Sequence, residues 1–169
     1  MRIAIFTLLA FCFSSVNASG EITLSSIQNS LGKEMEVAVA GQGDRAVILA
    51  HQYKGSWKSW EFFIPALVSE GYKVYAFDFN GYGKNGGFSK KRMNNDLDIE
   101  KVIELARTDG ASKVILIGSS MGAAAVLKAA LTNDVDGVVA MAPYHKRGGK
   151  FANLGDGEAE KVKAPVYLF

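Results

Sequence analysis

One stretch in the second half of the chain, Lys113 to Leu127, constrains the fold more than any other. It opens with a continuous run of Val, Ile and Leu over residues 114–117, which is typical of a strand buried on both faces. It closes, from Ala123 on, with small apolar residues that favour a helix. The sequence Gly-Ser-Ser-Met-Gly stands between them and reads G-x-S-x-G. A strand that turns this sharply into a helix predicts a strained backbone at Ser120.

The same stretch predicts a nucleophile. A serine at the apex of such a turn has its hydroxyl above the sheet edge, where the helix dipole favours developing negative charge. The alternative is that Ser120 only caps the helix, because G-x-S-x-G by itself also occurs by chance. The strand before it and the small-residue helix after it favour the nucleophile.

The amino-terminal residues predict export. Arg2 precedes an apolar run over residues 3–13, and small residues lead to Ala18. This layout is typical of a signal peptide over residues 1–18, which leaves a secreted or periplasmic domain over residues 19–169 that begins at Ser19. The apolar run is too short for a stable membrane anchor. Cys12, the one cysteine, lies inside it, so no disulfide or thiolate metal site is expected in the mature domain.

The charge balance narrows the range of partners. The formal net charge is +2, and Arg2 supplies one unit of it. A nearly neutral domain argues against nucleic acid or an anionic membrane as an obligate partner. We expect a small-molecule or acyl substrate, no cofactor and no metal; the sequence leaves the oligomeric state open.

Periodicity predicts strands alternating with helices. Buried or alternating apolar runs predict strands over residues 21–26, 34–40, 46–50, 73–79, 114–117, 135–142 and 165–169. Helical spacing predicts helices over residues 57–70, 95–108 and 123–131, the first of them kinked or broken at Pro65. For the second helix the expected inner face is Leu97, Val102, Ile103, Leu105 and Ala106. The fold class is therefore α/β: one domain with a mostly parallel sheet, edged by an antiparallel pair and covered by helices on both faces.

Three motifs then follow one another as they do in the α/β-hydrolase family, which the chain resembles from about Lys33 to Phe169. His51-Gln-Tyr follows the strand over residues 46–50, Asp78-Phe-Asn-Gly-Tyr-Gly83 follows the next strand, and G-x-S-x-G comes third. The resemblance implies a serine hydrolase that acts on an ester, thioester or amide through Ser120. It also implies an oxyanion hole made by the backbone N–H of Met121 with that of Tyr53, or less favourably that of Gln52. His51 is expected to shape its turn rather than to catalyse.

The glycines after the strand over residues 73–79 have a second interpretation. Gly81-Tyr-Gly-Lys-Asn-Gly86 fits the G-x-G-x-x-G of dinucleotide sites. It does not follow the first strand, open directly into a helix, or precede a strand that ends in a carboxylate. The D-x-x-G-x-G interpretation, in which this loop shapes a wall of the active site, is favoured.

The triad implied by the resemblance is incomplete in these residues. In this family the acid and then the histidine follow the serine. His145 is the only histidine after Ser120, and it precedes the place of the expected acid. We therefore expect a fragment of a longer hydrolase that lacks the last strand and helix, with its acid and histidine beyond Phe169. As 169 residues it should be inactive, and an open apolar edge at residues 165–169 should make it associate. The alternative is a non-catalytic relative that at most binds a ligand.

Overall fold

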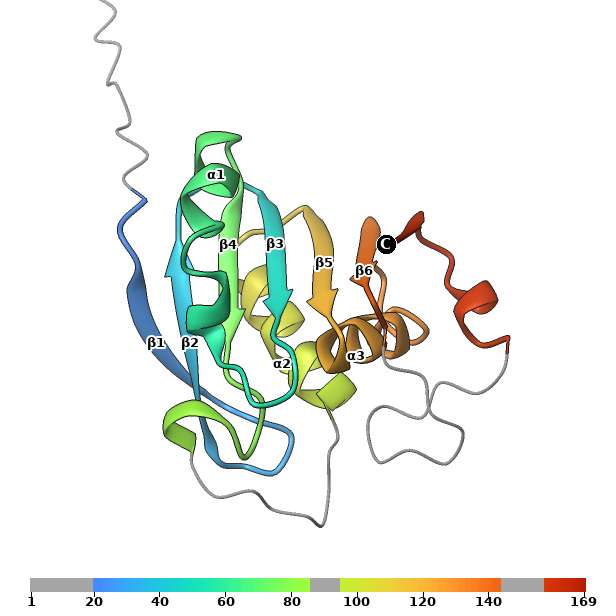
Figure 1. The fold of residues 1–169 in the computed structure, drawn as a ribbon. Coiled ribbons are helices and arrows are strands. Elements are labelled where there is room, and N and C mark those ends of the chain that lie inside the picture. Colours follow the sequence, from blue (N-terminus) through green and yellow to red (C-terminus); the bar gives the residue numbers. More distant parts are fainter. Residues whose placement is uncertain (1–19, 86–94, 144–156) are drawn as a thin grey trace, which may run out of the picture.

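The computed structural model describes residues 20–85, 95–143 and 157–169 (Figure 1). The predicted signal peptide, the run Lys90-Lys-Arg92 and His145 lie outside these residues. No helix in the described ranges is both long and apolar enough to cross a membrane.

The described residues form one seven-stranded sheet in the order β1-β2-β4-β3-β5-β6-β7. The strands are β1 (Thr23–Gln28), β2 (Glu34–Ala40), β3 (Arg45–Ala50), β4 (Lys73–Phe77), β5 (Lys113–Ser119), β6 (Gly137–Met141) and β7 (Val166–Leu168). β2 runs antiparallel to both β1 and β4, and every other neighbouring pair is parallel. The predicted mostly parallel sheet with an antiparallel pair at its edge is confirmed.

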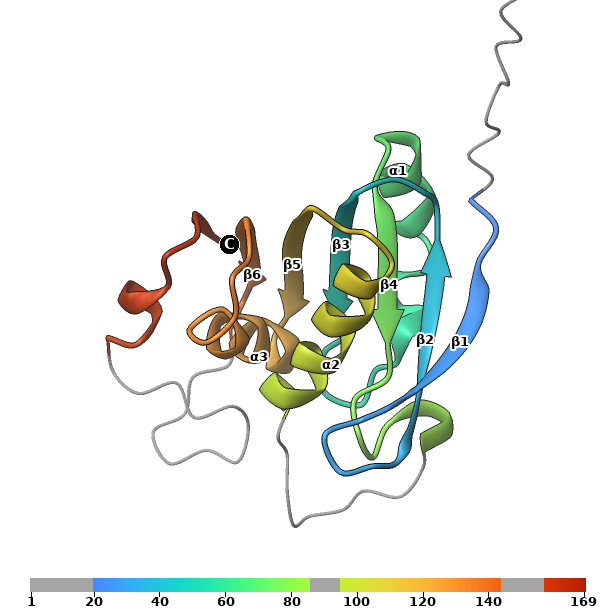
Figure 2. The ribbon, with the colours of Figure 1, turned by 180° about the vertical axis from the view of Figure 1, so that it is seen from behind.

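Helices cover both faces of the sheet, as Figures 1 and 2 show from opposite sides. The 3₁₀ segment η1 (Trp57–Trp60) and α1 (Ile64–Ser69) lie on one face, and α2 (Asn95–Thr108) and α3 (Met121–Ala129) lie on the other. Pro65 occupies the first turn of α1, where a backbone N–H has no acceptor within the helix, so proline loses no hydrogen bond there. The predicted helix over residues 57–70 is accordingly broken in two.

The inner face of α2 differs from the predicted one. Leu97 is 40% exposed, whereas Asp98 and Ile99 are buried. The carboxylate of Asp98 accepts hydrogen bonds from the backbone N–H and hydroxyl of Ser30 and from the N–H of Asn80. Periodicity assigns an aspartate to the solvent side, but these partners stabilise its burial and turn Leu97 outward.

The sheet ends, within the described residues, at β7, which pairs with β6 alone. Its last residues are apolar and exposed: Tyr167 is 60%, Leu168 60% and Phe169 78% accessible. The Phe169 carbonyl accepts from the N–H of Ala142, which ties this end of β7 to the end of β6. The apolar edge agrees with the expected one, and the association expected from it stays a prediction.

Candidate active site

The site lies at the carboxyl ends of the parallel strands, where β5 turns into α3. Ser120, between them, has φ 51° and ψ −109°, a left-handed conformation that costs a residue other than glycine about 1–3 kcal/mol. Its N–H donates to the carbonyl of Met141 at 2.8 Å, and its carbonyl accepts from the N–H of Ala124 at 3.2 Å. These bonds, to the end of β6 and into α3, hold the strained turn that the sequence predicted.

The two glycines of G-x-S-x-G allow this turn to form. A Cβ on Gly118 would lie 2.4 Å from the carbonyl oxygen of Gly122. A Cβ on Gly122 would lie 2.2 Å from the carbonyl oxygen of Ala50 and 2.7 Å from that of His51. The first turn of α3 therefore packs directly on the end of β3, and only glycine fits there. This contact places Met121 beside the loop that begins at His51.

His51 is a fixed part of that loop. It is fully buried, its Nε2 accepts from the N–H of Phe79 at 3.2 Å, and its Nδ1 lies 2.7 Å from the carbonyl oxygen of Gln52. Because Nε2 accepts, the proton resides on Nδ1 and is donated to Gln52. Burial lowers the pKa of His51 to about 4, so the ring is neutral near pH 7. Both nitrogens are engaged in shaping the turn, in agreement with the structural role expected of this residue.

The bonds of Gln52 set the direction of the next peptide group. Its carbonyl accepts from the N–H of Gly55 at 3.0 Å as well as from His51. In a planar trans peptide the C=O and the following N–H point in opposite directions. The N–H of Tyr53 is thus directed away from His51 and Gly55. The Gln52 side chain donates to Ser59 Oγ at 3.2 Å, which ties the loop to η1.

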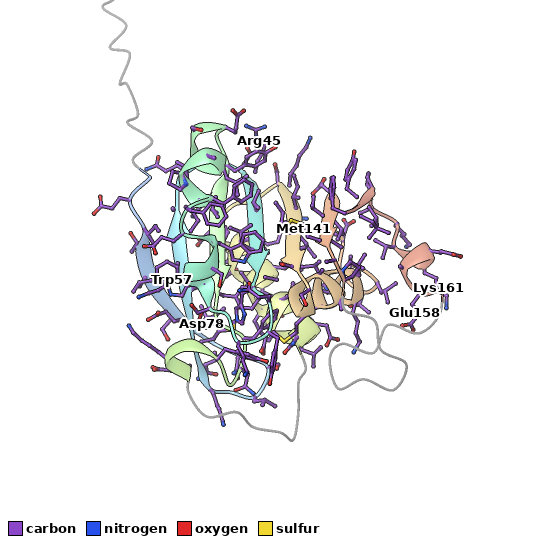
Figure 3. The ribbon with its side chains drawn as sticks, viewed as in Figure 1. Arg45, Trp57, Asp78, Met141, Glu158 and Lys161 are labelled. Atoms are coloured by element: carbon purple, nitrogen blue, oxygen red, sulfur yellow. The ribbon has the colours of Figure 1, made fainter. Side chains whose placement is uncertain are left out.

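The loop after β4 is closed around a buried carboxylate. Asp78 accepts from the N–H of Trp57 at 2.7 Å, and Figure 3 shows these two residues together at the carboxyl end of the sheet. A Cβ on Gly83 would lie 1.5 Å from Asp78 Oδ2, so the carboxylate occupies the space that a side chain would need. Burial raises the pKa of Asp78. The first and last positions of D-x-x-G-x-G are explained by this packing, without a nucleotide.

Two residues at this edge were not singled out from the sequence. Tyr82 is 6% exposed, and its hydroxyl donates to Met121 Sδ at 3.3 Å. Asp98, on α2, binds the N–H of Asn80 at the start of the same loop. Tyr82 stood inside a recognised motif, and that was the one available signal. The sequence around Asp98 gave no such signal, because neighbouring residues do not indicate whether an aspartate in a helix is buried.

Ser120 and the loops after β3 and β4 meet at this edge of the sheet, but the described residues contain no histidine that is free to act as a base for Ser120. In residues 20–85, 95–143 and 157–169 the one histidine is His51, and its nitrogens are already bound. The same residues contain no group of three or more His, Cys, Asp or Glu side chains able to hold a metal. The expected roles of Ser120, Met121, Tyr53 and Gln52 therefore stay predictions.

Known proteins match this arrangement over much of the chain. The hydrolase family model described as serine aminopeptidase, S33, matches residues 41–167. Epoxide hydrolase B of Mycobacterium tuberculosis is 36% identical over 81 residues, which are 46% of this chain and 22% of that protein. The bifunctional epoxide hydrolase 2 of Sus scrofa is 30% identical over 101 residues, 59% of this chain and 18% of that protein.

Solved structures show the same fold. Epoxide hydrolase A from Mycobacterium thermoresistibile is 31% identical with a TM-score of 0.60, over 72% of this chain and 39% of that one. The Pyrococcus furiosus esterase Pf2001 is 23% identical with a TM-score of 0.72, over 88% of this chain and 70% of that one, a likeness of fold alone. The chain spans about a fifth of the length of the curated relatives named here. With the family model matching most of its residues, the chain belongs to the α/β-hydrolase family.

Proposed function

We propose that this protein is a serine hydrolase that cleaves a carboxylic ester, thioester or amide through an acyl-enzyme on Ser120. The observation that carries the proposal is the left-handed backbone of Ser120 between β5 and α3. A strained conformation that costs free energy and is held from two sides is typical of a functional position. A serine that only capped α3 would not need it, and the Ser120 side chain makes no capping hydrogen bond.

In this mechanism Ser120 Oγ attacks the carbonyl carbon of the substrate and forms a tetrahedral oxyanion. The N–H of Met121, in the first turn of α3, has no intrahelical acceptor and is the first donor to that oxyanion. The N–H of Tyr53 is the second, because the hydrogen bonds on the Gln52 carbonyl direct it away from the loop. Gln52 stays the less favoured donor. Collapse of the intermediate expels the alcohol, thiol or amine, and water then releases the acid.

The proton of Ser120 needs an acceptor, and His51 is excluded by its two hydrogen bonds and its low pKa of about 4. Two sources outside the described residues stay open: His145, and a histidine of a longer protein. His145→Ala separates them. Loss of activity in this variant would identify His145 as the base.

The test is covalent labelling by a fluorophosphonate probe in a protein that supplies the acid and the base, since the 169 residues alone are expected to label slowly or not at all. Ser120→Ala should abolish labelling, whereas Ser119→Ala, one residue before the apex, should leave most of it. Labelling that survives Ser120→Ala would contradict the proposal. A protein that binds a substrate ester but neither labels nor hydrolyses it would favour the non-catalytic alternative.

Epoxide hydrolysis is a second candidate, because several relatives carry that name at 30% identity or more. Parallel assays with a p-nitrophenyl ester and an aryl epoxide distinguish the two candidates. Turnover of the epoxide alone would favour the second.

We also propose that the protein is exported with cleavage after Ala18, on the strength of Arg2 and the apolar run that follows it. Sequencing the amino terminus of the exported protein tests this. The expected terminus is Ser19, and retention of Met1 would contradict export.

A further inference from the structure

Tyr82 lies where the three loops of the site meet. Its ring contacts the rings of His51 and Tyr53 edge-on, with centroids 5.1 and 6.2 Å apart. Its hydroxyl donates to the sulfur of Met121 at 3.3 Å. The Tyr82 side chain thus contacts both residues whose N–H groups are proposed to bind the oxyanion. It also contacts His51, whose hydrogen bond to the Gln52 carbonyl fixes the peptide between Gln52 and Tyr53.

The loop that carries Tyr82 is itself held firmly. The N–H of Tyr82 donates to the carbonyl of Phe79 at 2.9 Å, which closes a tight turn through Gly81 at φ 86°. The N–H of Asn80, inside this turn, donates to the buried carboxylate of Asp98 at 3.0 Å. Gly83, on its far side, packs against Asp78. The backbone at Tyr82 is therefore fixed by hydrogen bonds and packing on both sides.

The phenol also has the protonation state that the contact requires. Tyr82 is 6% exposed, and burial raises its pKa to about 12, so it carries its proton throughout the neutral range. A thioether sulfur is a weak acceptor, so the hydrogen bond is modest in strength. Its effect is directional: it fixes Met121 relative to the loop after β4, which carries Tyr82.

We propose that Tyr82 is a positioning residue that holds the N–H groups of Met121 and Tyr53 at the separation a single oxyanion needs. This inference rests on the proposed function for its effect on turnover. Donors aimed at developing charge act only when their positions are preorganised, and misplacement by about 1 Å lowers a rate on the order of 100-fold. Tyr82 provides that preorganisation without touching the substrate.

The test compares Tyr82→Phe, Tyr82→Ala and a matched control. Tyr82→Phe removes only the hydrogen bond to sulfur and should lower kcat roughly threefold to tenfold. Tyr82→Ala also removes the ring contacts and should lower kcat on the order of 100-fold. KM should change less than twofold, since the oxyanion exists only after substrate has bound.

The control is Tyr75→Phe, because Tyr75 is also buried and its hydroxyl donates to Asp109 at 2.9 Å, at the opposite end of the sheet. It should leave kcat unchanged.

A double-mutant cycle gives a sharper result. In a Met121→Leu background no sulfur accepts the hydroxyl, so Tyr82→Phe should have no further effect on kcat. Equal effects of Tyr82→Phe in both backgrounds would overturn the role of the hydrogen bond. A fall in kcat as large in Tyr75→Phe would show a general loss of stability instead.

A measurement without turnover separates this inference from the proposed function. In ¹⁵N spectra, Tyr82→Phe should shift the amide resonances of Met121 and Tyr53, and Tyr75→Phe should not. Such shifts in a protein that contains the histidine base but shows no Ser120-dependent hydrolysis would uphold the positioning role and reject the serine hydrolase. Normal hydrolysis with unchanged kcat and unchanged amide resonances in Tyr82→Phe and Tyr82→Ala would overturn the inference alone.

Discussion

The two ends of the parallel sheet differ in how deeply they bury their polar groups. At the amino end, where Arg45 is labelled in Figure 3, partly exposed side chains pair with one another. Lys73 Nζ forms an ion pair with Asp109 Oδ2 at 2.9 Å, and the two side chains are 21% and 32% exposed. A guanidinium nitrogen of Arg107 lies 3.9 Å from Asp136 Oδ2. At the carboxyl end His51, Asp78 and Asp98 are at most 2% exposed and accept hydrogen bonds from backbone N–H groups.

This difference indicates what each end is built to do. Exposed ion pairs contribute about 0–1 kcal/mol each. Buried acceptors bear a desolvation cost, but they fix the loops at Trp57, Phe79 and Asn80. The buried groups at the carboxyl end therefore maintain the positions of the loops, and a site assembled from several loops needs that.

The largest effect should follow from filling the contact between α3 and β3. Gly122→Ala forces a methyl group into the Ala50 carbonyl, 2.2 Å away, and should lower the free energy of unfolding by about 3 kcal/mol or more. A Cβ on Gly110, at the amino end, would meet nothing within 4 Å, so the one cost of Gly110→Ala is the backbone strain at φ +92°. We expect this variant to lower the free energy of unfolding by about 1 kcal/mol. Urea denaturation of both variants measures the difference. Equal losses would refute the close contact of α3 with the end of β3.

The second effect is the response of His51 to acid. Its pKa of about 4 in the folded protein lies below the ordinary 6.5, so the unfolded chain binds the proton more tightly. The stability that this residue contributes is complete above pH 6.5 and is lost as the pH falls through 4, by up to about 3 kcal/mol. The difference in unfolding free energy between the wild type and His51→Gln, followed from pH 7 to pH 4, isolates the effect. A constant difference would show that His51 is not buried as a neutral ring.

The third comparison sets the aspartates of the two ends against each other. Asp98→Ala leaves the N–H of Asn80 and the Ser30 donors without their acceptor and should cost about 2 kcal/mol. Asp109→Ala should cost less, about 1 kcal/mol, because its pair with Lys73 is partly exposed and the Tyr75 hydroxyl is the one part-buried donor that loses its acceptor. Thermal and urea unfolding at pH 7 check both values, and a larger loss for Asp109→Ala would reverse the comparison.

The pH slopes of these two aspartates should have opposite signs. Burial raises the pKa of Asp98, so its contribution is complete below the ordinary value of 3.8 and is lost as the pH rises through the raised pKa. The hydrogen bond from Lys73 lowers the pKa of Asp109, so its contribution is present above 3.8 and is lost as the pH falls. Asp98→Asn and Asp109→Asn, each compared with the wild type between pH 3 and pH 7, should give these two slopes.

The smallest effect concerns the backbone strain at Ser120. At φ 51° glycine is favoured over alanine, so Ser120→Gly should be about 1 kcal/mol more stable than Ser120→Ala. Ser112, just before β5 at the amino end, is not among the residues with positive φ, and there alanine should be the more stable replacement. Calorimetry of the four variants tests this reversal. The same order at both positions would argue against strain at Ser120.

The sequence predicted the order of the elements well, because buried parallel strands and amphipathic helices have local signatures. The break at Pro65 and the strained turn at Ser120 follow from single residues whose backbone preferences are strong. The inner face of α2 was misjudged at Leu97, because the burial of Asp98 depends on donors from Ser30 and Asn80, distant in sequence. Periodicity contains no information about such partners.

For the site, the residues alone predicted Ser120 as the nucleophile and identified the strained turn that presents it and the loops that surround it. Each is a property of a few consecutive residues. Only the tertiary structure decided that Tyr82 meets Met121 across 39 positions of the chain, and that both nitrogens of His51 are occupied. Contacts of this kind depend on the register of β3, β4 and β5, which brings three loops to one edge of the sheet. That register is set by the packing of the whole core and by no segment alone.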